Sequence, residues 1–219
     1  MVTEILDTLP PECQPQTGPV LLLAHGAGAG ADSAFMTHFA TELAHAGFRV
    51  VRFNFPYMAK TALDGKRRPP DRAPKLIDAF EAALLHVAEN TPGPIIIGGK
   101  SMGGRIASML AAERPGLPIA GLVCLGYPFH PPGKSEKLRV AHLPDVSVPS
   151  LIVQGERDPF GGRALLDTLD LPSTFELHFA PDGNHDLSPR KASGHSAEGN
   201  WAAAISAITK KFDSDNAAT

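Results

Sequence analysis

The segment GGKSMGG, residues 98–104, places a lysine and a serine among glycines, a composition that suits two different chemistries. Lys100 and Ser101 could end a phosphate-binding loop, G-x-x-x-x-G-K-S/T, in which backbone amides and the lysine bind nucleotide phosphates. The same residues match G-x-S-x-G, in which a serine lies on a sharp turn between a strand and a helix with its hydroxyl exposed. The first pattern predicts a nucleotide-binding protein and the second a serine hydrolase.

The residues before Ser101 favour the hydrolase. A phosphate loop needs its first glycine at position 94, where the chain has Pro94. Its variable positions would be filled by the isoleucines at 95–97, which favour a β-strand. The G-x-S-x-G turn instead requires a strand before it and a helix after it, and PIIIGG and GGRIASMLAAE fit those elements. We therefore interpret Ser101 as a candidate nucleophile.

A serine hydroxyl needs a histidine to accept its proton and a carboxylate to orient that histidine. In folds with the G-x-S-x-G turn, the three residues follow in the order Ser, Asp or Glu, His, after later strands. The segment QGERDPFG, residues 154–161, follows an expected strand and offers Glu156 and Asp158. Asp158 lies farther beyond the strand and precedes a proline, so it is the expected carboxylate, whereas Glu156 belongs to the turn itself.

The expected base is His185, which lies in a turn of Asp, Gly and Asn after the last predicted strand and before the last predicted helix. His178 falls inside that strand, and His195 lies in a Ser/Gly-rich stretch near the helix, so both fit less well. The order Ser101, Asp158, His185 agrees with the order that the turn requires.

Acyl transfer also needs two backbone N–H groups that bind the developing oxyanion. Met102, directly after the nucleophile, is expected to supply one. The loop HGAGAG, residues 25–30, follows the first predicted strand, and Ala27 is the expected second donor, with His25 shaping the loop. A glycine-rich loop there could also bind a dinucleotide, but the pattern is not G-x-G-x-x-G, and the strand at 48–55 ends without an acidic residue.

Short apolar runs alternate with helical patterns along the chain. Strands are expected at 19–26, 48–55, 94–101, 119–128, 149–158 and 174–181. Helices are expected at 33–46, 74–90 and 103–114, after Gly162, and at about 196–212. The alternation predicts an α/β domain with a mostly parallel sheet and helices on both faces. We expect a single domain over residues 1–219, with its core at about 18–212 and peripheral segments at 1–17 and 213–219.

Two long connections, 56–74 and 127–146, follow strands and are expected to overhang the carboxyl edge of the sheet, where ligands bind in such folds. Residues that follow strand ends are the expected walls of a partly apolar substrate pocket: His25, Phe55, Met58, Phe129 and Phe160. Lys100 is expected either to reach solvent or pair with a carboxylate, or to add positive potential near the site.

The composition excludes several other classes of protein. The net charge of -3 over 219 residues argues against a nucleic-acid surface. The two cysteines indicate neither a disulfide framework nor a metal cluster. No apolar run approaches the ~20 residues that a membrane span needs, and the first residues do not resemble a signal peptide. A cytoplasmic protein that acts on a small molecule is expected.

The motifs LLLAHGAGAG, GGKSMGGR, GYPFHPPGK and QGERDPFG together resemble the α/β-hydrolase superfamily. More narrowly, they are similar to the small dienelactone-hydrolase-like group that includes testis-expressed-protein-like hydrolases. The resemblance covers about residues 18–212 and implies an eight-stranded sheet trimmed at its N-terminal edge, no large cap domain, and no metal or organic cofactor. It also implies Ser101, Asp158 and His185 as the catalytic triad. Dienelactone hydrolase itself uses a cysteine, so its substrate does not transfer.

The expected activity is hydrolysis of a carboxylic ester or thioester of a small molecule through an acyl-enzyme intermediate. The alternative is a non-catalytic or weakly catalytic module that binds a protein partner, because this fold also serves for binding alone.

Overall fold

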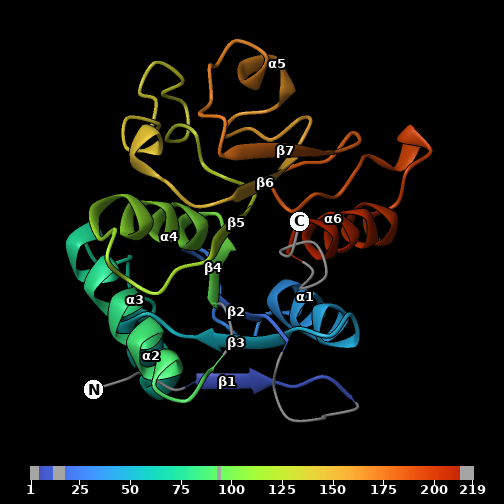
Figure 1. Cartoon of the computed structure of the whole chain (residues 1–219). Coiled ribbons are helices and arrows are strands. Elements are labelled where there is room, and N and C mark those ends of the chain that lie inside the picture. Colours follow the sequence, from blue (N-terminus) through green and yellow to red (C-terminus); the bar gives the residue numbers. More distant parts are fainter. Residues whose placement is uncertain (1–4, 12–17, 93–94, 213–219) are drawn as a thin grey trace.

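The computed structural model describes residues 5–11, 18–92 and 95–212. Its centre is a seven-stranded sheet with the strand order β1-β3-β2-β4-β5-β6-β7 (Figure 1). The strands are β1 (Ile5–Thr8), β2 (Val20–Ala24), β3 (Arg49–Phe53), β4 (Ile95–Lys100), β5 (Gly121–Leu125), β6 (Ser150–Gly155) and β7 (Phe175–Ala180). All neighbouring pairs are parallel except β1 and β3, which are antiparallel. The mostly parallel sheet expected from the sequence is confirmed.

The interior strands read as continuous apolar runs because helices cover both faces of the sheet. Every residue of β2, β4, β5 and β6 is buried. The helices α1 (Ala34–His45) and α6 (Ala197–Phe212) pack together on one face, and α3 (Ala73–Ala88) and α4 (Met102–Glu113) pack together on the other (Figure 1). The molecule therefore has three layers around two apolar cores, one on each side of the sheet.

Two elements differ from the expectations. The peripheral segment 1–17 contains β1, which pairs with the edge strand β3, and the segment expected as a loop at 56–74 contains the helix α2 (Pro56–Asp64). Short helical turns complete the fold: α5 (Arg163–Leu166), η1 (Leu143–Asp145) and η2 (Lys191–Ser193). The expected peripheral segment 213–219 lies outside the described residues. In the described part of the chain the sheet has seven strands, one fewer than the eight that the resemblance implies in full.

The connections place the reactive segments at one point of the sheet. The strand β2 has β3 on one side and β4 on the other, so the chain leaves the centre in opposite directions after β2 and after β3. Ligands of open α/β sheets bind at such a switch point, outside the carboxyl ends of the strands. The loop after β2 and the turn after β4 meet there. Among the described residues, no helix is long and apolar enough to cross a membrane.

Candidate active site

Ser101 lies on a strained turn between β4 and α4. Its φ of 52° and ψ of -114° put a non-glycine residue in a region that costs on the order of 1–3 kcal/mol. The turn fits only because the flanking glycines lack side chains: a Cβ on Gly99 would lie 2.3 Å from the carbonyl oxygen of Ala24, and one on Gly103 would lie 2.2 Å from it. The backbone N–H of Ser101 donates to the carbonyl of Leu125 at 2.9 Å, which ties the turn to the neighbouring strand.

The structure brings the expected serine, histidine and carboxylate together in one hydrogen-bonded chain. The Ser101 Oγ lies 2.8 Å from His185 Nε2, and His185 Nδ1 lies 2.8 Å from Asp158 Oδ2. Since ionised Asp158 can only accept, His185 Nδ1 carries the proton, and Nε2 is free to accept the serine proton. Asp158 is 4% exposed, and its second oxygen accepts the N–H of Phe160 at 2.8 Å.

A buried glutamine that the sequence analysis did not single out fixes the carboxylate. Gln154, in β6, is fully buried, and its Nε2 donates to Asp158 Oδ2 at 3.0 Å. The same amide nitrogen lies 3.1 Å from the carbonyl of Tyr127 and 2.7 Å from that of Gly161, and its Oε1 accepts the Tyr127 N–H at 2.7 Å. A polar residue inside an apolar strand, four positions before the expected carboxylate, was the available signal.

The residues that the sequence ranked lower lie elsewhere. The carboxylate of Glu156 accepts the Asp182 N–H at 2.8 Å and the Arg163 guanidinium at 3.1 Å, so it belongs to the turn as expected. His178 lies within β7 with its Nε2 buried and without a partner among the described residues. His195 is exposed, beyond η2.

His25 shapes the loop after β2 from inside the core. Its Nδ1 donates to the carbonyl of Gly26 at 2.6 Å, and its Nε2 accepts the Phe55 N–H at 3.0 Å. Burial lowers the pKa of His25 from 6.5, although the bond to Gly26 opposes the shift, so the ring is neutral, as these two bonds require. The Tyr57 hydroxyl also donates to the Gly26 and Ala27 carbonyls, at 3.4 Å and 3.2 Å.

These bonds orient the peptide between Gly26 and Ala27. No described peptide bond is cis, and in a trans peptide the C=O and N–H point in opposite directions. Because the Gly26 carbonyl points at His25 and Tyr57, the Ala27 N–H points away from the core, and Ala27 lines the space next to Ser101. Met102 is the first residue of α4, where an N–H has no acceptor within the helix.

Lys100 does not reach solvent. It is 8% exposed, and its Nζ donates to the His185 carbonyl at 2.5 Å and lies 3.2 Å from the Asp186 carboxylate. Burial lowers the pKa of Lys100 below 10.5, and Asp186 partly opposes that shift. Gly126 leaves room for this contact, since a Cβ there would lie 2.8 Å from the His185 carbonyl oxygen. The expected pairing with a carboxylate is thus present: the ammonium of Lys100 is buried, and its partner Asp186 is exposed.

Two cavities meet at Ser101. We call one the histidine cavity; it measures about 570 Å³, and its lining residues are Gly26, Ala27, Gly28, Ala29, Ser33, Phe35, Met36, Lys100, Ser101, Phe160, His185, Asp186, Ser188 and Trp201. We call the other the arginine cavity; it measures about 410 Å³, and its lining residues are Ala27, Pro70, Asp71, Ala73, Leu76, Ser101, Met102, Arg105, Ile106, Pro128, Pro132, Arg139 and Phe160. Both volumes fall within the roughly 300–1,000 Å³ of small-molecule sites.

Of the five expected pocket walls, only Phe160 lines these cavities, and its ring lies 4.4 Å from that of His185. Phe55 and Phe129 are fully buried in the core, where Phe55 packs edge-on against Phe53. Met58 is half-buried against the same core, and His25 lies beneath the loop. These four predictions are wrong because a residue after a strand end can point inward as well as toward the ligand. The two long connections do line the arginine cavity, as expected, through residues at 70–73 and 128–139.

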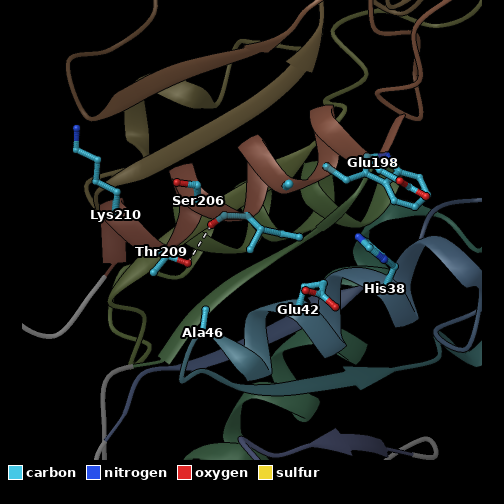
Figure 2. A pocket seen from close by; sticks show the side chains of 10 residues that line it. His38, Glu42, Ala46, Glu198, Ser206, Thr209 and Lys210 are labelled. Atoms are coloured by element: carbon cyan, nitrogen blue, oxygen red, sulfur yellow. Dashed lines mark hydrogen bonds between the residues drawn. The ribbon is translucent and has the colours of Figure 1, made fainter. Parts of the chain in front are cut away.

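A separate groove runs between α1 and α6. Figure 2 shows His38 and Glu42 of α1, with Ala46 directly after it, opposite Glu198, Ser206, Thr209 and Lys210 of α6. The Thr209 hydroxyl donates to the Ile205 carbonyl at 3.0 Å, a bond within α6. Ser101, His185 and Asp158 are not among the lining residues, so this groove is distinct from the hydrogen-bonded chain described above.

Known proteins are similar to this chain in sequence or in fold. A curated relative from Pongo abelii, named "Putative protein-lysine deacylase ABHD14B", is 27% identical over 188 residues, which cover 84% of this chain and 79% of the relative. A dienelactone hydrolase from Anabaena variabilis has the same fold, with a TM-score of 0.68 at 23% identity over 95% of this chain and 89% of that one. So does Est1E from Butyrivibrio proteoclasticus, solved with ferulic acid, with a TM-score of 0.70 at 15% identity over 95% of this chain and 94% of that one.

These structures confirm the α/β-hydrolase fold and the resemblance to dienelactone hydrolase. The sequence also matches the model of a protein family described as "Alpha/beta hydrolase domain" over residues 17–213. The chain therefore belongs to this alpha/beta hydrolase family.

Proposed function

We propose that this protein is a serine hydrolase that cleaves a carboxylic ester or thioester of a small molecule through an acyl-enzyme intermediate. The observation that carries the proposal is the continuous chain from Ser101 through His185 to Asp158, with both contacts at 2.8 Å. The two cavities that meet at Ser101 support a small-molecule substrate. The family supports hydrolysis as the class of reaction.

In the first half-reaction, Ser101 Oγ attacks the carbonyl carbon while His185 Nε2 takes the serine proton. Asp158 stabilises the imidazolium that forms. The carbonyl oxygen becomes an oxyanion, which the N–H groups of Ala27 and Met102 bind. One such donor typically lowers the activation free energy by on the order of 3 kcal/mol.

His185 then gives its proton to the leaving oxygen or sulfur, and the bond to the carbonyl carbon breaks. In the second half-reaction, water takes the place of the alcohol or thiol. His185 removes a proton from the water, the hydroxide attacks the acyl-serine, and the serine leaves with the proton that His185 returns. The sum is ester plus water giving acid plus alcohol, and the residues are restored.

The test is steady-state hydrolysis of p-nitrophenyl esters from acetate to octanoate, of a matching thioester, and of an acyl-lysine peptide, prompted by the curated relative's name. We expect ester hydrolysis to fall by about 10⁴-fold in Asp158→Asn and by at least as much in Ser101→Ala and His185→Gln. Ser206→Ala, which changes a serine of the α1–α6 groove, is the matched control and should retain full activity. Wild-type protein that is folded and hydrolyses none of these compounds would favour the alternative, a module that binds a partner without catalysis.

A further inference from the structure

The arginine cavity is lined by two arginines, and neither forms an ion pair with a carboxylate among the described residues. Arg105 lies on the first turn of α4, and Arg139 lies in the connection after β5. The backbone of Arg139 is fixed, because its N–H donates to the backbone carbonyl of Phe129 at 2.7 Å and its own carbonyl accepts the Tyr127 hydroxyl at 2.8 Å. Within the described residues, neither guanidinium forms an ion pair, and Arg105 Nε is buried without a partner. A buried donor of this kind is costly unless something binds it.

The other polar groups nearby do not cancel this charge. Asp71 also lines the cavity; its Oδ1 accepts the Lys75 ammonium at 2.8 Å, and its Oδ2 is buried without a partner among the described residues. One carboxylate against two guanidinium groups leaves the cavity with a net positive charge. The two arginines lie near each other in the cavity: burial, and then the charge of Arg105, lowers the pKa of Arg139. Next to Ser101, the cavity thus combines two positive charges, a donor that lacks an acceptor, and a single carboxylate.

The position of His185 decides which part of a substrate would enter this cavity. The imidazole must reach the leaving oxygen or sulfur to protonate it. His185 lines the histidine cavity and is not among the residues that line the arginine cavity. The alcohol or thiol therefore leaves through the histidine cavity, and the acyl group must extend from the scissile carbonyl into the arginine cavity.

We propose that the acyl group of the substrate ends in a second carboxylate, which Arg105 and Arg139 bind. The substrate would then be a monoester or monothioester of a dicarboxylic acid, and water would convert it to the free dicarboxylate, the alcohol or thiol, and a proton. This inference rests on the proposed function. Guanidinium groups suit a carboxylate because their planar N–H donors match its two oxygens.

Two isosteric esters test the proposal: the p-nitrophenyl ester of glutaric acid, with a free carboxylate, and that of glutaric acid monoamide, which is neutral. We expect wild-type kcat/KM to favour the carboxylate by at least about tenfold, because bonds to charged groups are worth more than neutral ones. The preference should shrink as salt is added, since ions screen the two arginines. Free glutarate should slow labelling of Ser101 by a fluorophosphonate, and the neutral diamide of glutaric acid should not.

Variants show whether the preference for the carboxylate comes from these two arginines or from the positive charge of arginines elsewhere on the protein. In Arg105→Gln and Arg139→Gln the ratio of the two kcat/KM values should fall toward one. Arg114→Gln is the matched control at the far end of the same helix, where Arg114 pairs with Asp78 and Glu81, and it should keep the wild-type ratio. Asp71→Asn removes the cavity's own negative charge and should raise the ratio.

The outcomes distinguish this proposal from the proposed function. Equal hydrolysis of both esters by wild type, or an unchanged ratio in both arginine variants, would overturn the dicarboxylate proposal and leave the hydrolase intact. Hydrolysis of neither ester together with no fluorophosphonate labelling would overturn both. If one arginine variant fails to fold, the other variant and the protection of wild type by glutarate still decide.

Discussion

The ammonium of Lys100 donates to the backbone carbonyl of His185 at 2.5 Å, so the last residue of β4 before Ser101 also fixes the loop that carries the histidine. Asp186, next to His185, completes the contact at 3.2 Å. We infer that Lys100 is a positioning residue, because its Nζ touches the loop behind the imidazole and leaves the imidazole itself free for Ser101.

Removal of this contact should affect turnover more than binding. We expect Lys100→Met to lower kcat by about 10- to 100-fold with little change in KM, because a shift of about 1 Å in a reacting group can cost that much. Lys100→Arg should recover part of the loss. Lys211→Met, which removes a half-buried lysine that pairs with the exposed Glu176 away from the site, is the control. Unchanged kcat in folded Lys100→Met would show that the loop keeps its place without the ammonium.

Gln154 should matter for both stability and activity. In Gln154→Leu, the Tyr127 N–H and the Gly161 carbonyl lose their partner inside the core, and each buried unpaired group costs about 1–3 kcal/mol. We expect the free energy of unfolding in urea to fall by about 2–4 kcal/mol. Because Asp158 also loses a donor, kcat should fall under conditions in which the variant is still folded. A stability equal to that of wild type would contradict the network.

The sequence predicted the parts of the site that follow from chain order and missed those that only the fold brings together. Ser101, Asp158 and His185 each follow a strand that could be recognised from its apolar run. Arg105 and Arg139 are 34 positions apart, and no local pattern indicates that they line one cavity.

The missed elements have physical reasons too. The strand β1 is only four residues long, and its pairing with β3, far along the chain, creates it. The helix α2 begins at Pro56, a residue favoured at the first helical position, and ends before Gly65 in a left-handed conformation. Those two signals were present in the segment, but its prolines and charges favoured a loop. The inward-facing Phe55 and Phe129 show that order along the chain does not fix the direction of a side chain.

The two glycines around Ser101 should resist substitution for a steric reason. A Cβ at Gly99 would lie 2.3 Å from a backbone carbonyl oxygen, which cannot move aside without separating β2 from α4. We expect Gly99→Ala to destabilise the protein by about 3 kcal/mol or more, or to prevent folding. Gly116→Ala, where nothing lies within 4 Å of the new carbon, should change stability by less than about 0.5 kcal/mol. Equal stability of the two variants by urea unfolding would refute the tight strand–helix contact.

His142 should make stability fall in mildly acidic solution. Burial, and then the nearby Arg105 guanidinium, lower the pKa of His142 from 6.5 to about 4. Between these two values the unfolded chain binds more protons than the folded one, so the contribution is complete above pH 6.5 and is lost as the pH falls toward 4. Because the ring is partly exposed, solvent screening reduces the effect to on the order of 1 kcal/mol.

The measurement is the loss of unfolding free energy between pH 7.5 and pH 4.5, compared in wild type and His142→Gln. Gln can still donate to Ser108 Oγ, which lies 2.8 Å from His142 Nε2 in wild type. Wild type should lose more stability than the variant over this range, and the difference cancels the contributions of other titrating groups. Equal losses in both proteins would contradict a neutral, half-buried His142.

The central claim is that Ser101 is a nucleophile activated by His185, and covalent labelling tests it most directly. A fluorophosphonate reacts with an activated serine hydroxyl whatever the natural substrate is, so the result does not depend on the choice of ester. Intact-mass analysis of wild type should show one added phosphonyl group, and peptide mapping should place it on Ser101. Ser101→Ala should stay unlabelled, and His185→Gln should react far more slowly. Folded wild type that remains unlabelled, or Ser101→Ala that reacts as wild type does, would contradict the account.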